Sequence, residues 1–306
     1  MGIVVLGAVF VDIKGYPLST YIPAGRNAGR IETVHGGVSR NVVEDIANVE
    51  LRPTFVSLVD KSGSGQDVID KLNRHKVDTR YMRKTEDGMG TWLAVFDHEG
   101  DVVGSISRRP NLRPIADILD EQGDEIFADC DGICLELDMD QEAVKRVFHY
   151  AEKYNKKVFA VISNINIAME RRDFLKRVDC FICNKQEAGI LFSENYDETP
   201  TEEMVKIVKE KAEKAQIRRL IVTLGGDGAV YTELNGESGY APAKQVHVID
   251  TTGAGDSFFA GVSIGVTYGK TLGEACEIGA RLAASVIGTK DNVCPRFMPA
   301  EFGLEV

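Results

Sequence analysis

Residues 250–261 read Asp-Thr-Thr-Gly-Ala-Gly-Asp-Ser-Phe-Phe-Ala-Gly, and this stretch decides the fold that we predict. It follows an apolar stretch at 246–249 that is typical of a strand, and it opens a helix at 255–268. Gly253 and Gly255 let the backbone turn sharply, so that successive N–H groups point outward at the helix N-terminus. These unpaired donors and the positive end of the helix dipole predict an anion site.

Asp256 lies in the first turn of this helix, where a carboxylate is favoured. There it could accept a proton from a substrate hydroxyl as a general base. The backbone at Gly253, Ala254 and Gly255 would stabilise the charge that develops on a transferring phosphoryl group, without a lysine. The alternative is an ordinary capped helix in which Asp256 is the cap.

Outward from this stretch, short apolar runs alternate with helical patterns, which predicts βαβ units and a mostly parallel sheet covered on both faces. No segment is typical of a linker, so we expect one domain over residues 1–306. We predict strands at 3–9, 54–59, 132–136, 157–162, 180–183 and 219–224, and an antiparallel addition at 229–234 and 239–242. We predict helices at 38–49, 65–75, 141–154, 171–176, 202–216, 255–268 and 272–287.

Two segments do not fit a parallel sheet. Residues 91–96 and 102–107 alternate apolar and polar side chains around a turn at 98–101, which predicts a hairpin. Residues 14–30 are rich in glycine, proline and polar residues and lack a helical period. The hairpin is either an edge extension of the main sheet or, together with residues 12–34, a small β flap over a site.

Composition excludes several classes of protein. Of 306 residues, 43% are hydrophobic, and 47 acidic against 36 basic residues give a formal net charge of −11. A net-acidic chain without a lysine or arginine block is a poor ligand for nucleic acids and anionic membranes. The longest nearly unbroken apolar run, residues 2–11, is too short to span a bilayer and lacks the charged start of a signal peptide.

Six cysteines are present, and the Cys180-Phe-Ile-Cys183 spacing suggests either a metal or redox pair or two structural thiols. The pair lies in an apolar run that is typical of a strand, where this odd spacing directs the two sulfurs to opposite faces. We therefore expect buried, reduced thiols, and with them a cytoplasmic protein.

Two further motifs lie at predicted strand ends, where ligands of open α/β sheets bind. The motif Thr223–Gly228 lies at the end of the strand at 219–224, and its Gly225 and Gly228 would let the main chain approach phosphates closely. After the strand at 180–183, Asn184 and Glu187 would hold Mg²⁺ through water, or would simply cap a helix.

Near the N-terminus, Asp12 ends the first strand, and Gly37 and Asn41 surround the start of a predicted helix. A carboxylate and an amide placed in this way suit the binding of vicinal hydroxyls, although Asp12 taken alone is more typical of a cap or surface residue.

In this order the motifs resemble the ribokinase-like, or PfkB, family of carbohydrate and nucleoside kinases. The resemblance runs from Asp12 through residues 36–41, 184–187 and 223–228 to 250–256. It implies a three-layer α/β/α fold with a mostly parallel central sheet and a small β lid, here residues 12–34 and 88–108. In several family members this lid mediates dimerisation, so a homodimer is expected.

The resemblance also implies roles for individual residues. Asp256 would be the catalytic base and the backbone of residues 253–255 the anion hole. ATP would contact Asn184, Thr223, Gly225, Gly228 and Thr252, Glu187 would order Mg²⁺ through water, and Asp250 with Thr252 would border a site for a monovalent cation such as K⁺. The phosphoryl acceptor would lie at Asp12, Lys14, Asn27, Gly37 and Asn41.

Within the family, the N-terminal third is most similar to pseudouridine kinases, through residues 12–15, 26–30 and 36–41. Asn27 carries a donor and an acceptor on one amide and suits the edge of a uracil-like base. The chain departs from this subgroup at residues 9–11, 160–163 and 108–110. Phe10 is expected in the core, or stacked on a base; Arg108 and Arg109 are expected to be solvated, or to bind an anionic acceptor.

The resulting hypothesis is an ATP-dependent kinase that phosphorylates a hydroxymethyl group of a sugar or nucleoside, with pseudouridine as first candidate. The alternatives are a ribokinase- or fructokinase-type sugar kinase, a purine nucleoside kinase, and a sensor that binds a nucleoside or sugar without catalysis. A dinucleotide-dependent oxidoreductase is excluded, because no Gly-x-Gly-x-x-Gly follows the first strand.

Overall fold

The computed structural model describes residues 2–99, 101–170 and 172–305. Within these residues the main sheet has nine strands in the order β13-β12-β11-β10-β9-β8-β1-β4-β5. In this order, every neighbouring pair from β11 across to β5 is parallel. Strands β12 and β13 extend the sheet beyond β11 in antiparallel fashion. The strands are β1 (Val4–Leu6), β4 (Thr54–Asp60), β5 (Met82–Thr85), β8 (Ile133–Glu136), β9 (Val158–Val161), β10 (Cys180–Asn184), β11 (Arg219–Thr223), β12 (Ala229–Glu233) and β13 (Ser238–Ala241).

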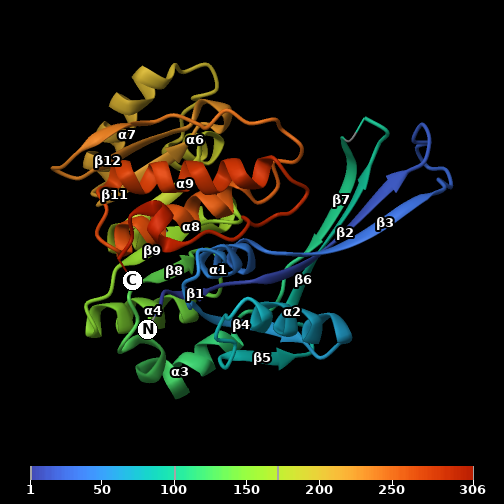
Figure 1. Ribbon diagram of the computed structural model, residues 1–306, viewed down its shortest axis with the longest axis horizontal. Helices are drawn as coiled ribbons and strands as arrows, with labels where there is room; N and C mark the ends of the chain where they lie inside the picture. Colours follow the sequence, from blue (N-terminus) through green and yellow to red (C-terminus); the bar gives the residue numbers. More distant parts are fainter. Residues whose placement is uncertain (1, 100, 171, 306) are drawn as a thin grey trace.

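Helices cover both faces of this sheet (Figure 1). One apolar cluster joins the sheet to α3 (Pro114–Phe127), α4 (Gln141–Lys153), α6 (Lys185–Phe192) and α7 (Thr201–Ala215). The other joins the opposite face to α1 (Val38–Asn48), α2 (Gly63–Arg74), α8 (Ala254–Thr267) and α9 (Leu272–Ile287). Shorter helical pieces are α5 (Ile165–Met169), η1 (Arg172–Arg177), η2 (Gly225–Asp227) and η3 (Pro299–Phe302). The expected three-layer α/β/α architecture is confirmed.

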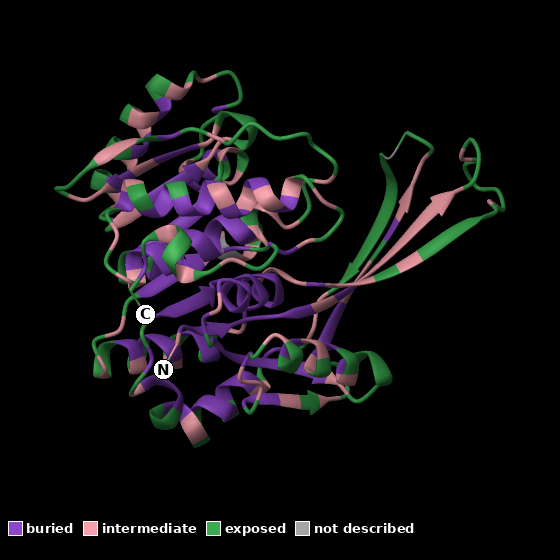
Figure 2. Ribbon diagram, viewed as in Figure 1, coloured by how far each residue is buried: buried purple, intermediate pink, exposed green. Residues whose placement is uncertain are grey.

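A second, four-stranded sheet extends away from this body (Figure 1). Its order is β3-β2-β6-β7, built from β2 (Val9–Pro17), β3 (Gly29–Gly36), β6 (Met89–Phe96) and β7 (Val102–Arg108). β2 and β6 are parallel, and the outer pairs are antiparallel. Figure 2 shows exposed and half-buried residues along most of this sheet, in contrast to the buried strands of the body. We call this sheet the lid.

The structure corrects several details of the sequence analysis. The expected strand at 246–249 does not form: Val248 and Ile249 are exposed, and no strand of the described chain pairs with this segment. The predicted first strand at 3–9 is divided, because the chain passes from β1 into β2 at residues 7–8. Strand β5 and helix α3 were not predicted. Residue 100 of the expected turn and residue 171 of the expected helix at 171–176 lie outside the described residues.

The cysteines behave as expected. All six are free and buried. Cys180 belongs to the apolar cluster on one face of the sheet and Cys183 to the cluster on the other. Burial raises the pKa of Cys134 and Cys180 to about 12, which suits inert thiols. Over the described residues, each helix is either too short or too polar to span a bilayer.

Helices α8 and α9 pack unusually closely, and small residues allow it. A Cβ at Gly261 would lie 2.7 Å from the Cα of Gly279, and one at Gly265 would lie 2.7 Å from the Cβ of Ala275. The contact joins the second half of α8 to the first half of α9.

We therefore expect Gly261→Ala to force the two helices apart and to lower the free energy of unfolding by about 1–3 kcal/mol, the usual cost of overpacking. Gly63→Ala is the control, because a Cβ at Gly63 meets nothing within 4 Å. Urea denaturation measures both variants. Equal stability of Gly261→Ala and the unsubstituted protein would contradict the close packing of α8 and α9.

Candidate active site

The N-terminus of α8 is built as an anion site. Gly253 caps the helix with a φ of 83°, and a Cβ there would collide with the carbonyl oxygen of Asn292, so only glycine fits. The amide of Ala254 donates to the Thr251 carbonyl at 3.2 Å. The amides of Gly255 and Asp256 have no acceptor among the described residues. These two donors, at the positive end of the helix dipole, are free for an anion.

A cavity of about 400 Å³ opens beside these amides. Thr223, Gly225 and Gly228 line it together with Ala254 and Gly255, so the motif after β11 and the motif at α8 face the same space. Gly225 and Gly228 have φ values of 61° and 100°, which favour glycine. A Cβ at Gly225 or at Gly255 would meet nothing within 4 Å, because both positions border open space.

Much of the lining of this cavity is apolar. It includes Val246 and Val248 from the segment that was expected to be a strand, and Ala280, Ala284 and Ile287 from α9. The apolar side chains of Val246 and Val248 therefore line the cavity and do not belong to the sheet. Such a cavity, with an anion site at one end, suits a nucleotide.

Asp256 is held by a side chain from the far end of the sequence. The Asn41 amide Nδ2 donates to its Oδ2 at 2.6 Å. Gly37, at the start of α1, has a φ of 98°, and a Cβ there would lie 2.7 Å from the carbonyl oxygen of Ala8. Asp256 is the third residue of α8 and does not cap it, because Gly253 does.

Burial raises the pKa of Asp256 to about 6, and the negative charge of Asp12 acts in the same direction. The hydrogen bond from Asn41 and the charge of Arg40 oppose this shift. Burial also raises the pKa of Asp12, whose carboxylate lies against Gly36. The Asn41 hydrogen bond and the charge effect of Asp12 on Asp256 show that these three side chains lie near one another, with Gly37 close by at the start of α1.

Asn184 lies next to Thr223 across the sheet, since the two are paired in β10 and β11. Its side chain accepts from the Glu187 amide, and the Glu187 carboxylate accepts from the Asn184 amide, both at 2.8 Å. This is the helix-capping arrangement considered above. Burial, and then the charge of Asp138, raise the pKa of Glu187. The Glu187 carboxylate and the Asn184 amide oxygen are hard oxygen donors at the carboxyl edge of the sheet, and they are the residues that would hold Mg²⁺.

Thr252 and Asp250 lie on the loop before α8. The Thr252 amide donates to the Asp250 carboxylate at 2.9 Å, and Thr252 is exposed. The adjoining backbone of Gly253 lies against the Asn292 carbonyl. Carboxylate and hydroxyl oxygens are donors that a monovalent cation prefers, so Asp250 and Thr252 are the residues that would hold one.

Two predicted acceptor residues lie on the lid. Lys14 is close enough to Asp12 to lower its pKa through charge. Asn27 lies in the loop between β2 and β3, where its amide bonds to the backbone of Ile22 at 2.8 and 3.0 Å. The structure therefore does not bring Asn27 together with Asn41 and Asp256; its amide braces the lid loop.

Phe10 is half-buried and packs against the core, and its ring fills the space over Gly90. Arg109 is not solvated as expected. It donates to Asp138 at 2.7 Å, because that carboxylate is fully buried and needs a partner. Arg108 donates to the Met89 carbonyl at 3.2 Å.

A polar cluster at the carboxyl end of β8 was not predicted from the sequence. Glu136 accepts hydrogen bonds from the Ala8 amide and from the hydroxyls of Ser39 and Ser163, at 2.9–3.0 Å. Asp138 accepts from the Ser163 amide at 2.8 Å. The sequence could have shown this cluster through two acidic residues, Glu136 at the end of a buried strand and Asp138 two residues later.

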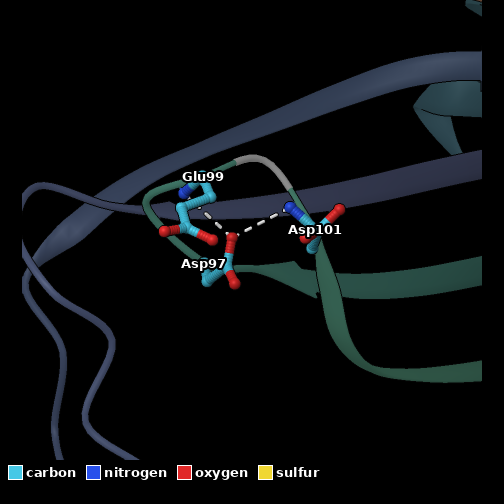
Figure 3. A group of neighbouring side chains, drawn as sticks. All are labelled: Asp97, Glu99 and Asp101. Atoms are coloured by element: carbon cyan, nitrogen blue, oxygen red, sulfur yellow. Dashed lines mark hydrogen bonds between the residues drawn. The ribbon is translucent and has the colours of Figure 1, made fainter.

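The lid tip carries another acidic group, Asp97, Glu99 and Asp101 (Figure 3). Asp97 accepts from the amides of Glu99 and Asp101, both at 2.9 Å. These bonds explain the group as a braced turn, so we assign no ion to it.

Comparison with known proteins agrees with this architecture. The chain matches the model of the pfkB family of carbohydrate kinases over residues 2–293, and it belongs to that family. It is 33% identical to a guanosine-inosine kinase of Exiguobacterium acetylicum, with 95% of each chain covered. It is 26% identical to a pseudouridine kinase of Escherichia coli, covering 85% of this chain and 82% of that one.

Among solved structures, the ribokinase of Arabidopsis thaliana complexed with ribose and ATP superposes with a TM-score of 0.86. It covers 98% of this chain and 97% of that one at 19% identity, and it shows the shared fold. The protein is thus a carbohydrate or nucleoside kinase of the ribokinase-like fold.

The raised pKa of Asp256 has a consequence for stability. The folded protein binds this proton more tightly than the unfolded chain, so ionisation of Asp256 lowers the free energy of unfolding as pH rises from about 4 through about 6. Asn cannot ionise, and its oxygen still accepts from Asn41. We therefore expect Asp256→Asn to be more stable than the unsubstituted protein at pH 7.5, and the difference to shrink towards pH 4.

Urea denaturation at several pH values measures this difference. Asp129→Asn is the control, because Asp129 is exposed. A stability difference for Asp256→Asn that does not change with pH would contradict the raised pKa.

Proposed function

We propose that this protein transfers the γ-phosphoryl group of ATP to a hydroxymethyl group of a nucleoside. The observation that carries the proposal is the convergence of Asp256, the free amides of Gly255 and Asp256, and the cavity beside them. Asp256 accepts the proton of the acceptor hydroxyl. The two amides stabilise the charge that develops on the transferring group.

Other residues hold the reactants in place. Asp12, Gly37 and Asn41 grip the acceptor, with Lys14 beside Asp12, and Thr223, Gly225 and Gly228 follow the nucleotide phosphates. Glu187, with Asn184, would hold Mg²⁺ through water, which would supply charge neutralisation of the phosphates. Asp250 and Thr252 border a site for K⁺. The chain acts as one domain whose lid, residues 12–34 and 88–108, excludes water from the site.

The lid favours a nucleoside over a free sugar as the acceptor. Asp12 pairs with Trp92 in the parallel β2–β6 ladder, so the two side chains share one face of the lid. Trp92 and Phe96 pack edge to face at 6.4 Å, and Phe96 stacks on Tyr16 at 4.7 Å. Aromatic rings beside the residue that grips the sugar suit a planar base.

Among nucleosides, the similarity to the guanosine-inosine kinase extends further and is stronger than that to the pseudouridine kinase. We therefore propose inosine or guanosine as the first candidate and pseudouridine as the second. A sugar kinase for ribose or fructose is the alternative within the family.

An ADP-release assay with Mg²⁺ and K⁺ over inosine, guanosine, adenosine, pseudouridine, uridine, ribose and fructose tests the proposal. We expect the highest kcat/KM for a nucleoside. Trp92→Leu should raise the KM for that nucleoside by about tenfold, since stacking a base on an aromatic ring is worth about 1–3 kcal/mol. It should leave any turnover of ribose unchanged, because ribose has no base.

Trp92→Phe is the matched control, because it keeps an aromatic face. Asp256→Asn should lower kcat by about 10²- to 10⁴-fold while the acceptor still binds. A kcat/KM for ribose above that of every nucleoside would support the sugar kinase. Binding without turnover of all acceptors would support the sensor.

We also propose a homodimer in which the other face of the lid packs against a second copy. Ile13, Leu93 and Ile106 form an apolar row across three strands of that face. Ile106 is 70% exposed, and Ile31, on the next row of the same face, is 76% exposed. A continuous apolar sheet face of this kind is typical of an interface.

Sedimentation should therefore show a dimer for the unsubstituted protein and a monomer for Ile106→Asp, because the carboxylate would be buried in the interface. Ile190→Asp is the control: Ile190 is exposed on α6, in the body of the protein. The lid interface would be contradicted if neither Ile106→Asp nor Ile190→Asp dissociated the dimer, or if both did. The six buried thiols fit the reducing cytoplasm, where we place the protein.

A further inference from the structure

Arg40 is a fully buried cation beside the candidate active site. Its side chain is 0% exposed, and so is nearly all of Glu44, with which it pairs at 2.5 Å. A second guanidinium nitrogen donates to the His35 carbonyl and to the Asn41 Oδ1. Burial of such a pair costs more free energy than an apolar pair would, so stability alone does not account for it.

The contact with Asn41 fixes which way that amide faces. A guanidinium has donors only, so the atom of Asn41 that meets it must be the oxygen. The Asn41 nitrogen then faces Asp256 and donates to it at 2.6 Å. With the amide reversed, its NH₂ would meet the guanidinium and its oxygen would meet the carboxylate, and both contacts would be repulsive.

Arg40 is itself held from two sides. The other oxygen of Glu44 accepts from Lys71 of α2 at 2.9 Å. The His35 carbonyl, at the end of β3, also accepts from Asn292, next to the Gly253 cap of α8, at 2.9 Å. The guanidinium thus connects the lid strand, α1 and the segment that supports the anion site.

The two cations that pair with Glu44 carry more charge than this one carboxylate can neutralise. Arg40 and Lys71 share the single carboxylate of Glu44, which leaves one excess positive charge. Arg40 lowers the pKa of both Asp12 and Asp256, so the excess charge faces the two carboxylates of the site.

We propose that Arg40 is a positioning residue, whose guanidinium holds the Asn41 amide in the orientation that binds Asp256 and whose charge keeps Asp256 ionised. Its part in catalysis rests on the function proposed above. The groups that face this cluster are Glu44 and Asp45 of α1, Asp12 and Lys14 of β2, His35 of β3, Asp67 and Lys71 of α2, His75 directly after α2, and Asp256 of α8.

The pH profile of kcat/KM tests the proposal. Arg40→Met should move the acid limb of the profile upward by about one pH unit, because loss of a nearby opposite charge disfavours the carboxylate. Lys71→Met is the matched control: it removes the cation on the other oxygen of Glu44, which does not touch Asn41, and should move the limb less. The proposal would be overturned if the acid limb lay at the same pH in Arg40→Met and in the unsubstituted protein. It would also be overturned if Arg40→Met and Lys71→Met moved the acid limb by the same amount.

Arg40→Lys separates charge from geometry. It keeps a cation opposite Glu44, so the fold and the acid limb should be retained. It loses the planar fork that holds Asn41 and His35 together, so kcat at the pH optimum should fall by about tenfold. An unchanged kcat would overturn the positioning role, even where Arg40→Met fails to fold.

A measurement without catalysis separates this inference from the proposed function. Asp256→Asn should raise the urea midpoint at pH 7.5 by more in the Arg40→Met background than in the unsubstituted protein, because the carboxylate that it removes has lost its cation. The same increase in both backgrounds would overturn the proposal whatever the substrate is. If the increase is larger in the Arg40→Met background but none of the acceptors is turned over, the positioning of Asn41 and Asp256 by Arg40 stands and the proposed function is refuted.

Discussion

The hydrogen bond between Asn41 and Asp256 is the interaction on which the site depends, because it joins segments 215 residues apart. Beside it, Asp45 accepts from the Ser257 hydroxyl at 2.7 Å and from the Cys294 amide at 2.6 Å. Three parts of the chain therefore meet at α1: the lid strands that lead into it, the N-terminus of α8, and the segment after α9. The anion site, the carboxylate and the acceptor side of the cleft are fixed relative to one another through this one helix.

This arrangement uses charge where apolar packing would be more stable. Between Ser39 and Asn48, α1 buries polar and charged side chains that a stability-driven helix would expose. Burial also raises the pKa of Asp45 to about 7, although hydrogen bonds from Ser257 and Cys294 oppose the shift. Polar groups buried in this way are costly unless each finds a partner, and the partners come from α2, α8 and the C-terminal segment. Such a helix is stable only in the complete fold, which is consistent with a role in the site.

The sequence predicted the elements whose signal is local and missed those whose signal is tertiary. The apolar runs of β8 to β11 and the Gly-rich turn before α8 were sufficient for the parallel sheet and the anion site. The strand predicted at residues 246–249 was wrong, because apolar side chains that line a cavity have the same composition as a buried strand. Helix α3 was predictable: Pro114 begins it, and Ile115, Ile118 and Leu119 have helical spacing. The contacts of Arg40 and Arg109 were not, because both bind residues that only the fold brings close.

The lid shows why strand register matters for function. Successive side chains of a strand point to opposite faces, so β2 presents Asp12 to the site and Ile13 to the other side. The same alternation in β6 places Trp92 beside Asp12 and Leu93 beside Ile13. A shift of one residue in the β2–β6 pairing would move the Trp92 ring away from Asp12 and bring the aliphatic Leu93 to the face that Asp12 occupies. One register therefore sets both the polar, aromatic face of the lid and its apolar face. A slip of the strands would exchange the two faces and disrupt contacts made through either of them.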